Sequence, residues 1–445
     1  MGTLQSIPAA PGALPLFGHL TRMLRDPFGL FADLHKYGDL VRIFFGPSEI
    51  VVVCAAELTR EVLLHDRTFD KAGPLFELGC ELFGQNLATC PHDLHRVRRR
   101  RAQPAFHRDR LVGYADTMTS HIDNFTRSWR NDQIVDVWSA TRKLTAAVIA
   151  DTIFGASLPA HHLERMVNAL TTIIDGSVTQ TVMPAAWRRL PLPANRHYRA
   201  AKAQVRRIVH DITADRHPGD GDQGSLISAL VAAEISTADL ANEIAMLFVA
   251  GYETTASTLA WALHLLAKHP DVEHRLHAEV QMVLGGAPAG YDHLTDLDLT
   301  ARVITESLRL HPPAWVITRK VTSDTELGGH NLSAGTTLLY SPHIIHHRSD
   351  LYHQPDRFDV DRWLPGHASN LPRGAYIPFG HGARRCIGEH FATMEATLAL
   401  ATIIARWELR PIPGTVVRPA LAASTHPKGL LMKAVARHPT KSGLL

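Results

Sequence analysis

The chain has 445 residues, with 46 basic and 43 acidic side chains and a formal net charge of +3. A charge this close to balance excludes the strong electrostatic field of a nucleic-acid-binding or anionic-membrane-binding protein, so chemistry on a small molecule is favoured. The four cysteines (Cys54, Cys80, Cys90 and Cys386) are too few and too scattered for a disulfide framework or a CxxC zinc site. They favour a reducing compartment, the cytoplasm.

The N-terminal stretch MGTLQSIPAAPGALPLFGHL lacks a basic region and an apolar run long enough to span a membrane. Pro8, Pro11 and Pro15 would interrupt a helix there. We therefore expect a proline-rich lead-in over about residues 1–25, with neither a signal peptide nor a membrane anchor.

Alternating apolar residues predict a β-hairpin over residues 40–56, with Gly46 and Pro47 at its turn. Helical patterns dominate from about residue 57 to 310. Breaks are expected near residues 73, 91, 184 and 190–193, in a loop at 217–225, and at 285–290. Strands return at 325–340 and in the last forty residues. Since neither a repeat nor a long low-complexity linker divides the chain, we predict one domain over residues 1–445, mainly α with small β-sheets (α+β).

A run of arginines follows His95 in the sequence HRVRRRRAQPAF. By itself such a run is typical of the solvated basic face of a helix.

A second motif, AGYETT, spans residues 250–255 inside an apolar helix predicted from about Thr237 to Lys268. Its glycine, Gly251, costs about 1 kcal/mol against alanine in a helix interior. Glu253 and Thr254 place polar groups in a sequence that otherwise reads as buried, so they need partners or a function. The alternative is a helix kink with a solvated acid.

In the third motif, ESLRLHPP, Glu306 and Arg309 lie three residues apart on one face of a helix that Pro312 and Pro313 end. Alone, the pair is typical of a surface ion pair that adds little stability. The histidines between 343 and 353 have no accompanying cysteine and no repeated ligand spacing, so a zinc site is not favoured.

The fourth motif, FGHGARRCIG, spans residues 379–388 and places Cys386 in a loop with three glycines. The glycines at 380, 382 and 388 allow turns and the close approach of a flat ligand. A helical pattern follows, so the N-terminal amides of that helix would stabilise a thiolate at Cys386. Such a thiolate can bind iron. Arg384 can anchor a carboxylate.

Taken together, these motifs resemble those of the cytochrome P450 superfamily, over nearly the whole chain. Phe379, Gly382, Arg384, Cys386 and Gly388 fill the positions of its haem-binding loop. The resemblance implies the P450 fold, with haem b (iron protoporphyrin IX) between this proximal cysteine loop and a long distal helix. It also implies that Cys386 is the iron ligand.

The resemblance assigns further roles residue by residue. In the distal helix, Ala250 and Gly251 would leave space beside the haem, while Thr254 and Glu253 would deliver protons during oxygen activation. Residues expected to face the haem propionates are His95 (where the family has tryptophan), Arg99, Arg319 and Arg384. Glu306, Arg309 and Arg357 would form a buried charge network that supports the cysteine loop.

The predicted substrate pocket draws on residues 75–87 and 170–195, Leu247, Ala250, Val316, Ile317 and Leu430. These residues are mostly aliphatic, which suits a hydrophobic substrate with few functional groups. Similarity to bacterial terpene-oxidising members favours a terpene or another secondary metabolite. Steroids, fatty acids and macrolides stay open.

We therefore predict a haem-thiolate monooxygenase that inserts one atom of O₂ into a hydrophobic small molecule. Without a flavin or iron–sulfur domain after the haem region, its electrons would come from NAD(P)H through a ferredoxin reductase and a ferredoxin. The remaining arginines after His95 would form the docking surface for an acidic ferredoxin. We expect a cytoplasmic monomer. Oxidative coupling or desaturation on the same haem, and a haem-thiolate ligand-binding protein without turnover, are the alternatives.

Overall fold

The computed structural model describes residues 4–155, 159–183, 185–213, 225–232, 237–367, 371–421 and 424–437. The chain forms two compact units: unit 1 comprises Met1–Arg98 and Arg309–Cys386, and unit 2 comprises Arg99–Leu308 and Ile387–Leu445. The predicted break at Pro184 lies outside the described residues, as does the predicted loop at 217–225 apart from Ser225.

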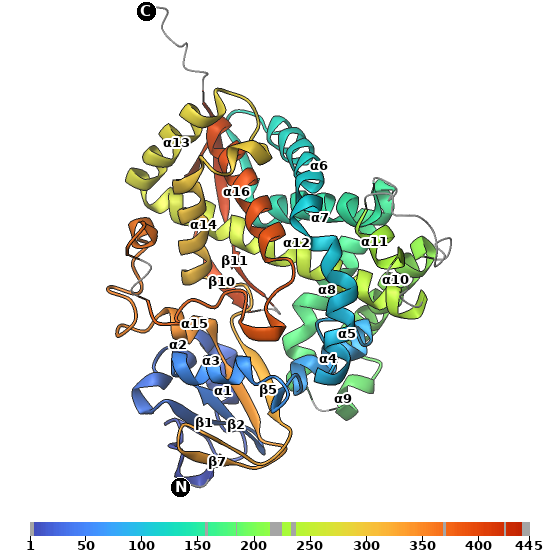
Figure 1. Ribbon diagram of the computed structural model, residues 1–445, viewed down its shortest axis with the longest axis vertical. Coiled ribbons are helices and arrows are strands. Elements are labelled where there is room, and N and C mark those ends of the chain that lie inside the picture. Colours follow the sequence, from blue (N-terminus) through green and yellow to red (C-terminus); the bar gives the residue numbers. More distant parts are fainter. Residues whose placement is uncertain are drawn as a thin grey trace, which may run out of the picture. The chain divides into compact units, whose positions relative to one another are not determined.

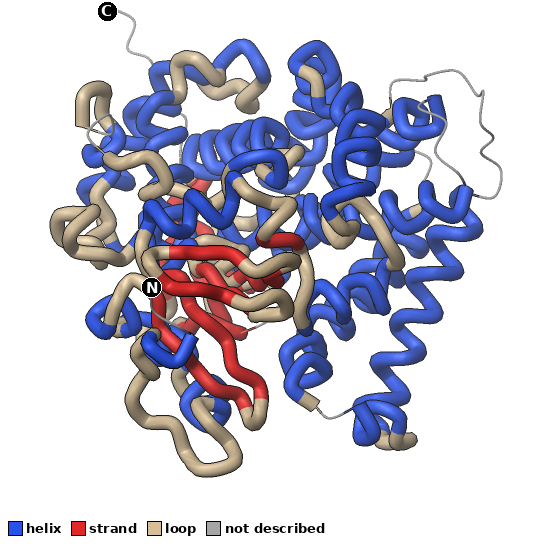
Figure 2. The backbone as a smooth tube through the Cα atoms, turned by 60° about the horizontal axis from the view of Figure 1, so that its bottom comes forward, coloured by secondary structure: helices blue, strands red, loops and turns tan. Residues whose placement is uncertain are grey.

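Unit 1 is built on a five-stranded sheet of order β1-β2-β8-β5-β3. Its strands are β1 (Leu40–Phe45), β2 (Ser48–Val53), β3 (Phe69–Asp70), β5 (Ile317–Val321) and β8 (Thr337–Tyr340). The predicted hairpin is confirmed, because β1 and β2 pair antiparallel with Leu40 opposite Val53. Strand β2 then pairs in parallel with β8, so chain segments far apart in sequence share one sheet (Figures 1 and 2). A second small sheet pairs β6 (Thr325–Leu327) with β7 (His330–Leu332).

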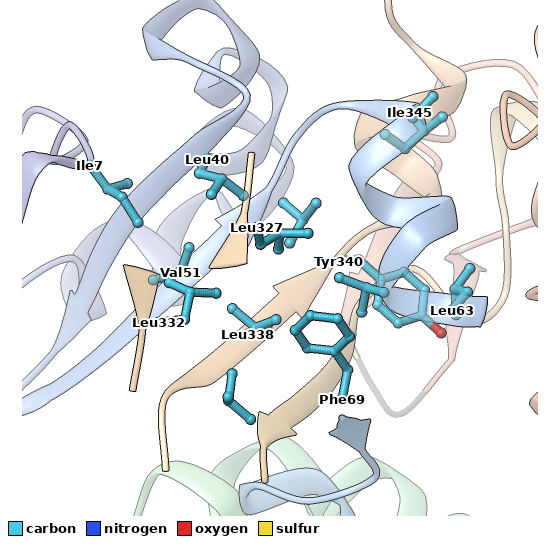
Figure 3. Close-up of a cluster of buried hydrophobic side chains, with 14 of the residues drawn as sticks. Ile7, Leu40, Val51, Leu63, Phe69, Leu327, Leu332, Leu338, Tyr340 and Ile345 are labelled. Atoms are coloured by element: carbon cyan, nitrogen blue, oxygen red, sulfur yellow. The ribbon is translucent and has the colours of Figure 1, made fainter. Parts of the chain in front are cut away.

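A cluster of buried side chains fills the core of unit 1 (Figure 3). Ile7 comes from the N-terminal lead-in, Leu40 and Val51 from the hairpin, and Leu338 and Tyr340 from β8. The lead-in is fixed to the sheet by backbone hydrogen bonds between residues 8–10 and Arg42. Burial of these apolar side chains stabilises the unit by about 25 cal/mol per Å² removed from water.

The helices of unit 1 are α1 (Leu20–Arg25), α2 (Pro27–Ala32), α3 (Ala56–Leu64), α4 (Pro74–Phe83) and α15 (Pro342–His346). Cys80 lies within α4. The apolar spacing PLFELGCELF carries a helix there despite the glycine in its middle.

Unit 2 is predominantly helical (Figure 1). Its helices are α6 (Arg108–Arg127), α7 (Val137–Phe154), α8 (Ala160–Val182), α9 (Ala185–Arg189), α10 (Pro193–Thr213), α11 (Leu226–Ala232), α12 (Thr237–Lys268), α13 (Pro270–Leu284) and α16 (Glu389–Arg406). The long helix α12 has the predicted bounds and packs against α7, α10 and α16. Two helices, α5 (His92–Ala102) and α14 (Asp298–Leu310), cross the sequence boundaries of the units.

Two sheets complete unit 2, one of order β4-β12-β9 and one pairing β10 with β11. The strands are β4 (Gln133–Asp136), β9 (Trp407–Pro411), β10 (Arg418–Leu421), β11 (Thr425–Lys428) and β12 (Leu431–Ala436). Strands near the C-terminus are therefore confirmed. β3 and β4 are too short to show a period-two pattern, which explains why the sequence did not predict these two strands.

Short 3₁₀ helices connect several elements; they span Leu4–Ser6, Leu34–Tyr37, Gln103–Phe106, Tyr291–His293, Val360–Trp363 and Gly382–Arg384. Throughout the part of the chain that the structure describes, no helix is both long and apolar enough to cross a membrane.

Candidate functional site

Cys386 lies in a tightly turned loop, three residues before α16 begins at Glu389. Its backbone N–H donates to the carbonyl of Phe379 at 2.9 Å and closes the loop. Gly380 and Gly382 have φ values of +70° and +69°, so the predicted glycine turns are confirmed at these two positions. Of the four cysteines, Cys386 is the one with an exposed side chain, so its sulfur is accessible to a ligand.

The glycines of this loop serve different purposes. A Cβ on Gly382 would lie 2.4 Å from the carbonyl oxygen of Leu63 at the end of α3, so only glycine fits there. Gly388 has an ordinary φ of −91°, and the nearest atom to its virtual Cβ is Cε1 of Phe106 at 3.8 Å. No described atom lies close enough to exclude a side chain at position 388. The close approach of a flat ligand therefore stays the predicted reason for this glycine.

Arg384 holds the loop to the segment that follows α3. Its Nε donates to Asp66 at 3.1 Å, its Nη2 to Asp70 at 2.8 Å, and its Nη1 to the carbonyl of Cys90 at 2.8 Å. The side chain is almost fully buried, so these charge-assisted bonds are protected from water. They use three of the five guanidinium N–H donors. A carboxylate partner was predicted for Arg384, and the chain itself supplies two.

Arg319 lies on β5 and is buried, with Nη1 donating to the carbonyl of Thr318 at 3.2 Å. Its guanidinium stands over the rings of Tyr340 and Phe76, at 5.4 and 5.8 Å from their centroids. Cation–π contacts stabilise the charge but leave most of its hydrogen-bonding capacity for another acceptor.

A further basic residue, Lys71, lies near Arg319 and Arg384. The sequence did not identify it as a site residue. Its Nζ donates to the carbonyl of Ala88 at 2.6 Å. Burial, followed by the charges of Arg319 and Arg384, lowers the pKa of Lys71 to about 7. Below a pH of about 7, Lys71, Arg319 and Arg384 together carry more positive charge than Asp66 and Asp70 balance, which favours binding of an additional carboxylate. A single lysine after a short strand is too common a pattern to have predicted this.

His95 and Arg99 lie four residues apart on α5 and therefore on one side of that helix. His95 is buried and Arg99 is half-buried, while Arg96, Arg100 and Arg101 are exposed. Arg98, one of the arginines expected at the solvated face, is half-buried like Arg99. The solvated face of the run is therefore formed by Arg96, Arg100 and Arg101.

Glu253 on α12 is buried, with 4% of its surface exposed. Ser424 donates to its Oε1 at 2.9 Å, and Nε of Arg142 lies 3.5 Å from its Oε2. Burial raises the pKa of this carboxyl, although Arg142 and Ser424 act in the opposite direction. A solvated acid at a helix kink is therefore excluded.

Arg142, on α7, is a second residue that the sequence analysis missed. Its guanidinium lies over the rings of Trp138 and Tyr252, at 5.3 and 5.7 Å. Its Nε and the Oε2 of Glu253 both lack a hydrogen bond although both are buried. Arg142 and Glu253 are thus close enough for an ion pair but share no hydrogen bond between Nε and Oε2. A small rotation of either side chain would change the distance between these two atoms.

Thr254 is half-buried and donates from Oγ1 to the carbonyl of Ala250 at 2.6 Å. Ala250 itself is exposed in the middle of this long helix. A Cβ on Gly251 would lie 2.7 Å from Cδ1 of Ile149 on α7. The role predicted for Gly251 therefore needs correction: its missing side chain makes room for α7, and only Ala250 presents a small side chain to open space.

Glu306 and Arg309 on α14 are both fully buried, so the alternative of a surface ion pair was wrong. Arg309 donates to the backbone carbonyls of Pro355, His346 and Arg357, at 2.7, 2.8 and 3.2 Å. The side chain of Arg357 is exposed and donates to Gln354. The predicted buried charge network is therefore corrected: Arg357 contributes its backbone carbonyl, and its guanidinium lies at the surface.

Comparison with known proteins settles the family. A family model described as Cytochrome P450 matches residues 8–435. The chain belongs to the cytochrome P450 family. It is 39% identical to pentalenene oxygenase of Streptomyces avermitilis over 437 residues, which cover 97% of each chain. It is also 40% identical to cyclooctatin synthase of Streptomyces melanosporofaciens, over 92% of this chain and 91% of that one.

A solved structure agrees with this assignment. The crystal structure of the cytochrome P450DA heme domain matches with a TM-score of 0.88 and 25% identity, covering 97% of this chain and 98% of that chain. The P450 fold predicted from the motifs, mainly α with small sheets, is thus confirmed, and the protein is a cytochrome P450 monooxygenase that carries haem b.

The side chains of this P450 fit such a cofactor. An exposed cysteine sulfur suits iron, and the excess of positive charge around Lys71 and Arg319 suits the carboxylates of protoporphyrin. Part of the predicted substrate pocket, including the side chain of Leu75 and residue 184, lies outside the described residues.

Proposed function

We propose that this P450 hydroxylates a terpene or a related lipophilic secondary metabolite. Its relatives at 39–40% identity are named for pentalenene, cyclooctatin and cyclooctat-9-en-7-ol. These names, two of which are those of an oxygenase and a monooxygenase, and the aliphatic composition of the predicted pocket support this proposal.

Cys386 is the proposed iron ligand. Lys71, Arg319, Arg384, His95 and Arg99 are the proposed partners of the haem carboxylates, with Phe379, Gly382 and Gly388 shaping the loop. When bound, the haem supplies the iron at which O₂ is activated. The protein's own contribution is to hold the sulfur, neutralise the carboxylates and manage protons.

The observation that carries monooxygenation is the pair Glu253 and Thr254 on α12. The Thr254 hydroxyl hydrogen-bonds to Ala250 and retains acceptor capacity on Oγ1, so it can receive a proton and pass one on. Burial raises the pKa of the Glu253 carboxyl, which favours the protonated form that can donate a proton. Arg142 and Ser424 position that carboxyl. A protein that only bound ligands would need neither group.

Electrons are proposed to come from a ferredoxin that docks on the exposed arginines of α5. Replacing Arg100 and Arg101 with glutamate should slow ferredoxin association several-fold and weaken its dependence on ionic strength. Arg418→Glu, an exposed arginine on β10, serves as the control. Equal association rates for both variants and the wild type would contradict docking on α5.

The reaction itself is tested by incubating the protein with NAD(P)H, surrogate ferredoxin and ferredoxin reductase, ¹⁸O₂ and a panel of terpenes. One ¹⁸O atom in the product supports insertion. A product without ¹⁸O would indicate coupling or desaturation, and substrate binding without any product would indicate a ligand-binding protein.

We also place the protein in the cytoplasm as a monomer. None of the four cysteines, all of them in the described part of the chain, forms a disulfide, and burial raises the pKa of Cys54 to about 12, so this thiol is unreactive. Cysteines without disulfides support a reducing compartment.

A further inference from the structure

His346, the last residue of α15, is fully buried and bonded on both ring nitrogens. Its Nδ1 lies 3.0 Å from the carbonyl oxygen of Arg309, and its Nε2 lies 3.0 Å from the backbone nitrogen of Ile377. The ring also stacks on Tyr376, with centroids 5.4 Å apart and planes at 22°. The side chain of His346 therefore joins the end of α14 to Ile377, which lies just before the cysteine loop.

These two contacts fix the protonation of the ring. The backbone N–H of Ile377 can only donate, so Nε2 must accept. The carbonyl of Arg309 can only accept, so Nδ1 must carry the proton and donate. Burial and the neighbouring charges of His347 and Arg309 hold the pKa of His346 well below its usual range, which keeps this neutral tautomer at physiological pH.

The contact with Arg309 is reciprocal. While His346 donates to the Arg309 carbonyl, Nη1 of Arg309 donates to the His346 carbonyl at 2.8 Å. The Arg309 guanidinium also holds the carbonyls of Pro355 and Arg357. His346 is thus fixed to a buried arginine that donates to three backbone carbonyls.

On its other side, His346 leads to the cysteine loop by a short path. The carbonyl of Ile377 accepts from Gly380 at 3.0 Å, and the carbonyl of Phe379 accepts from Cys386 at 2.9 Å. Ile377 is itself buried in the core of unit 1. Any shift of Ile377 would therefore move the turn at Gly380 and the backbone that closes onto Cys386.

We propose that His346 is a positioning residue for the thiolate loop: its imidazole ties the end of α14 to Ile377 and so fixes the place at which Cys386 presents its sulfur. The inference rests on the proposed role of Cys386 as iron ligand. No other side-chain type offers a rigid donor and acceptor of this shape in a fully buried position, and an aliphatic residue would leave both backbone groups unsatisfied.

The test compares His346→Leu and His346→Gln with the matched variant His343→Leu in the haem-loaded, full-length protein. His343 lies on the same helix and contacts Phe28 and His347 through its ring. For each protein we would measure the melting temperature and, after reduction under carbon monoxide, the fraction of thiolate-type Soret band and its rate of loss.

We expect His346→Leu to lose the thiolate-type band several-fold faster than His343→Leu at a matched fraction of folded protein. His346→Gln should be intermediate, because its amide retains one donor and one acceptor. If His346→Leu does not fold, His346→Gln against His343→Gln decides by the same measurements.

Equal band fractions and equal rates of loss in the His346 and His343 variants would overturn the proposal. A wild-type protein without a thiolate-type band would instead refute the role of Cys386, so the two failures are distinguishable.

Discussion

At the scale of single residues, Glu253 and Thr254 are neighbours in α12 whose side chains have different surroundings. Glu253 is buried against Arg142 and Ser424, whereas Thr254 is half-buried and bonds only to its own helix among the contacts described. The sequence predicted the pair from its motif. It could not predict Arg142 or Ser424, because they lie more than a hundred positions away and their local patterns are ordinary.

Thr254→Ala should leave haem binding intact but divert reducing equivalents to peroxide, because the hydroxyl that passes protons is lost. We expect a several-fold fall in product formed per NAD(P)H consumed, measured together with peroxide release. Thr258→Ala is the control, since Thr258 makes the same kind of bond, to the carbonyl of Thr254, one turn later. Fully coupled turnover by Thr254→Ala would contradict its role in proton delivery.

Arg142→Met should raise the pKa of Glu253 further, because Arg142 opposes the effect of burial. A carboxyl whose folded-state pKa is raised destabilises the fold as pH rises through that pKa, since the ionised form is then disfavoured. We therefore expect a loss of about 3–5 kcal/mol in the free energy of unfolding at pH above the new pKa, and a smaller loss in acid. Urea unfolding across pH measures this.

The double variant Arg142→Met with Glu253→Gln provides the control for that experiment. It removes the buried acid together with its partner, so part of the lost stability should return and the added pH dependence should disappear. A loss in Arg142→Met that is the same at every pH would show that the arginine acts through its contacts with Trp138, Tyr252 and Thr171 and not through Glu253.

Lys71→Met should weaken haem retention and flatten its pH dependence. Lys71 has a pKa of about 7 without haem, and a bound haem carboxylate would raise it, so its proton, and with it the attraction for that carboxylate, is lost as pH rises above 7. Wild-type haem transfer to excess apomyoglobin should therefore accelerate above this pH, whereas transfer from Lys71→Met should be faster below it and change less. Lys320→Met, at an exposed position on β5, should behave as wild type. Parallel pH profiles for the wild type and Lys71→Met would contradict the role of Lys71.

At the scale of elements, α12 and α7 are held close by small groups and backbone contacts. Gly251 allows Ile149 to approach α12, and Thr145 of α7 donates to the carbonyl of Tyr252 at 2.8 Å. The length of α12 could be predicted from its apolar sequence. The reason for its glycine could not, because helix periodicity does not say which neighbour faces each side.

Gly251→Ala should destabilise the protein by about 1–3 kcal/mol, since the new methyl group would overlap Cδ1 of a stiff, buried Ile149. Ile149→Ala should cost less stability in the Gly251→Ala protein than in the wild type, because the new methyl group fills part of the space left by the isoleucine. Gly113→Ala in α6 is the control: no described atom lies within 4 Å of its virtual Cβ, so alanine should stabilise by about 1 kcal/mol. Thermal unfolding measures all three. Equal melting temperatures for Gly251→Ala and Gly113→Ala would contradict the packing role.

At the scale of the whole molecule, local sequence patterns predicted the hairpin, the bounds of α12, the helix that ends at the prolines after Arg309, and the glycine turns around Cys386. They failed where partners are distant along the chain. Arg384 bonds to Asp66 and Asp70, which lie 318 and 314 positions away in the sequence. The sequence also could not show that Arg357 contributes its backbone carbonyl while its guanidinium is exposed. Motifs carry chemistry locally, whereas charge pairing depends on the tertiary fold.

The central claim is that the sulfur of Cys386 binds the haem iron as a thiolate. The most direct measurement is the absorption spectrum of the reduced, carbon monoxide-bound protein, for the wild type, Cys386→Ser and the control Cys80→Ser. We predict the red-shifted Soret band of a thiolate-ligated haem in the wild type and Cys80→Ser, and its loss in Cys386→Ser. An unaltered band in Cys386→Ser would contradict the account.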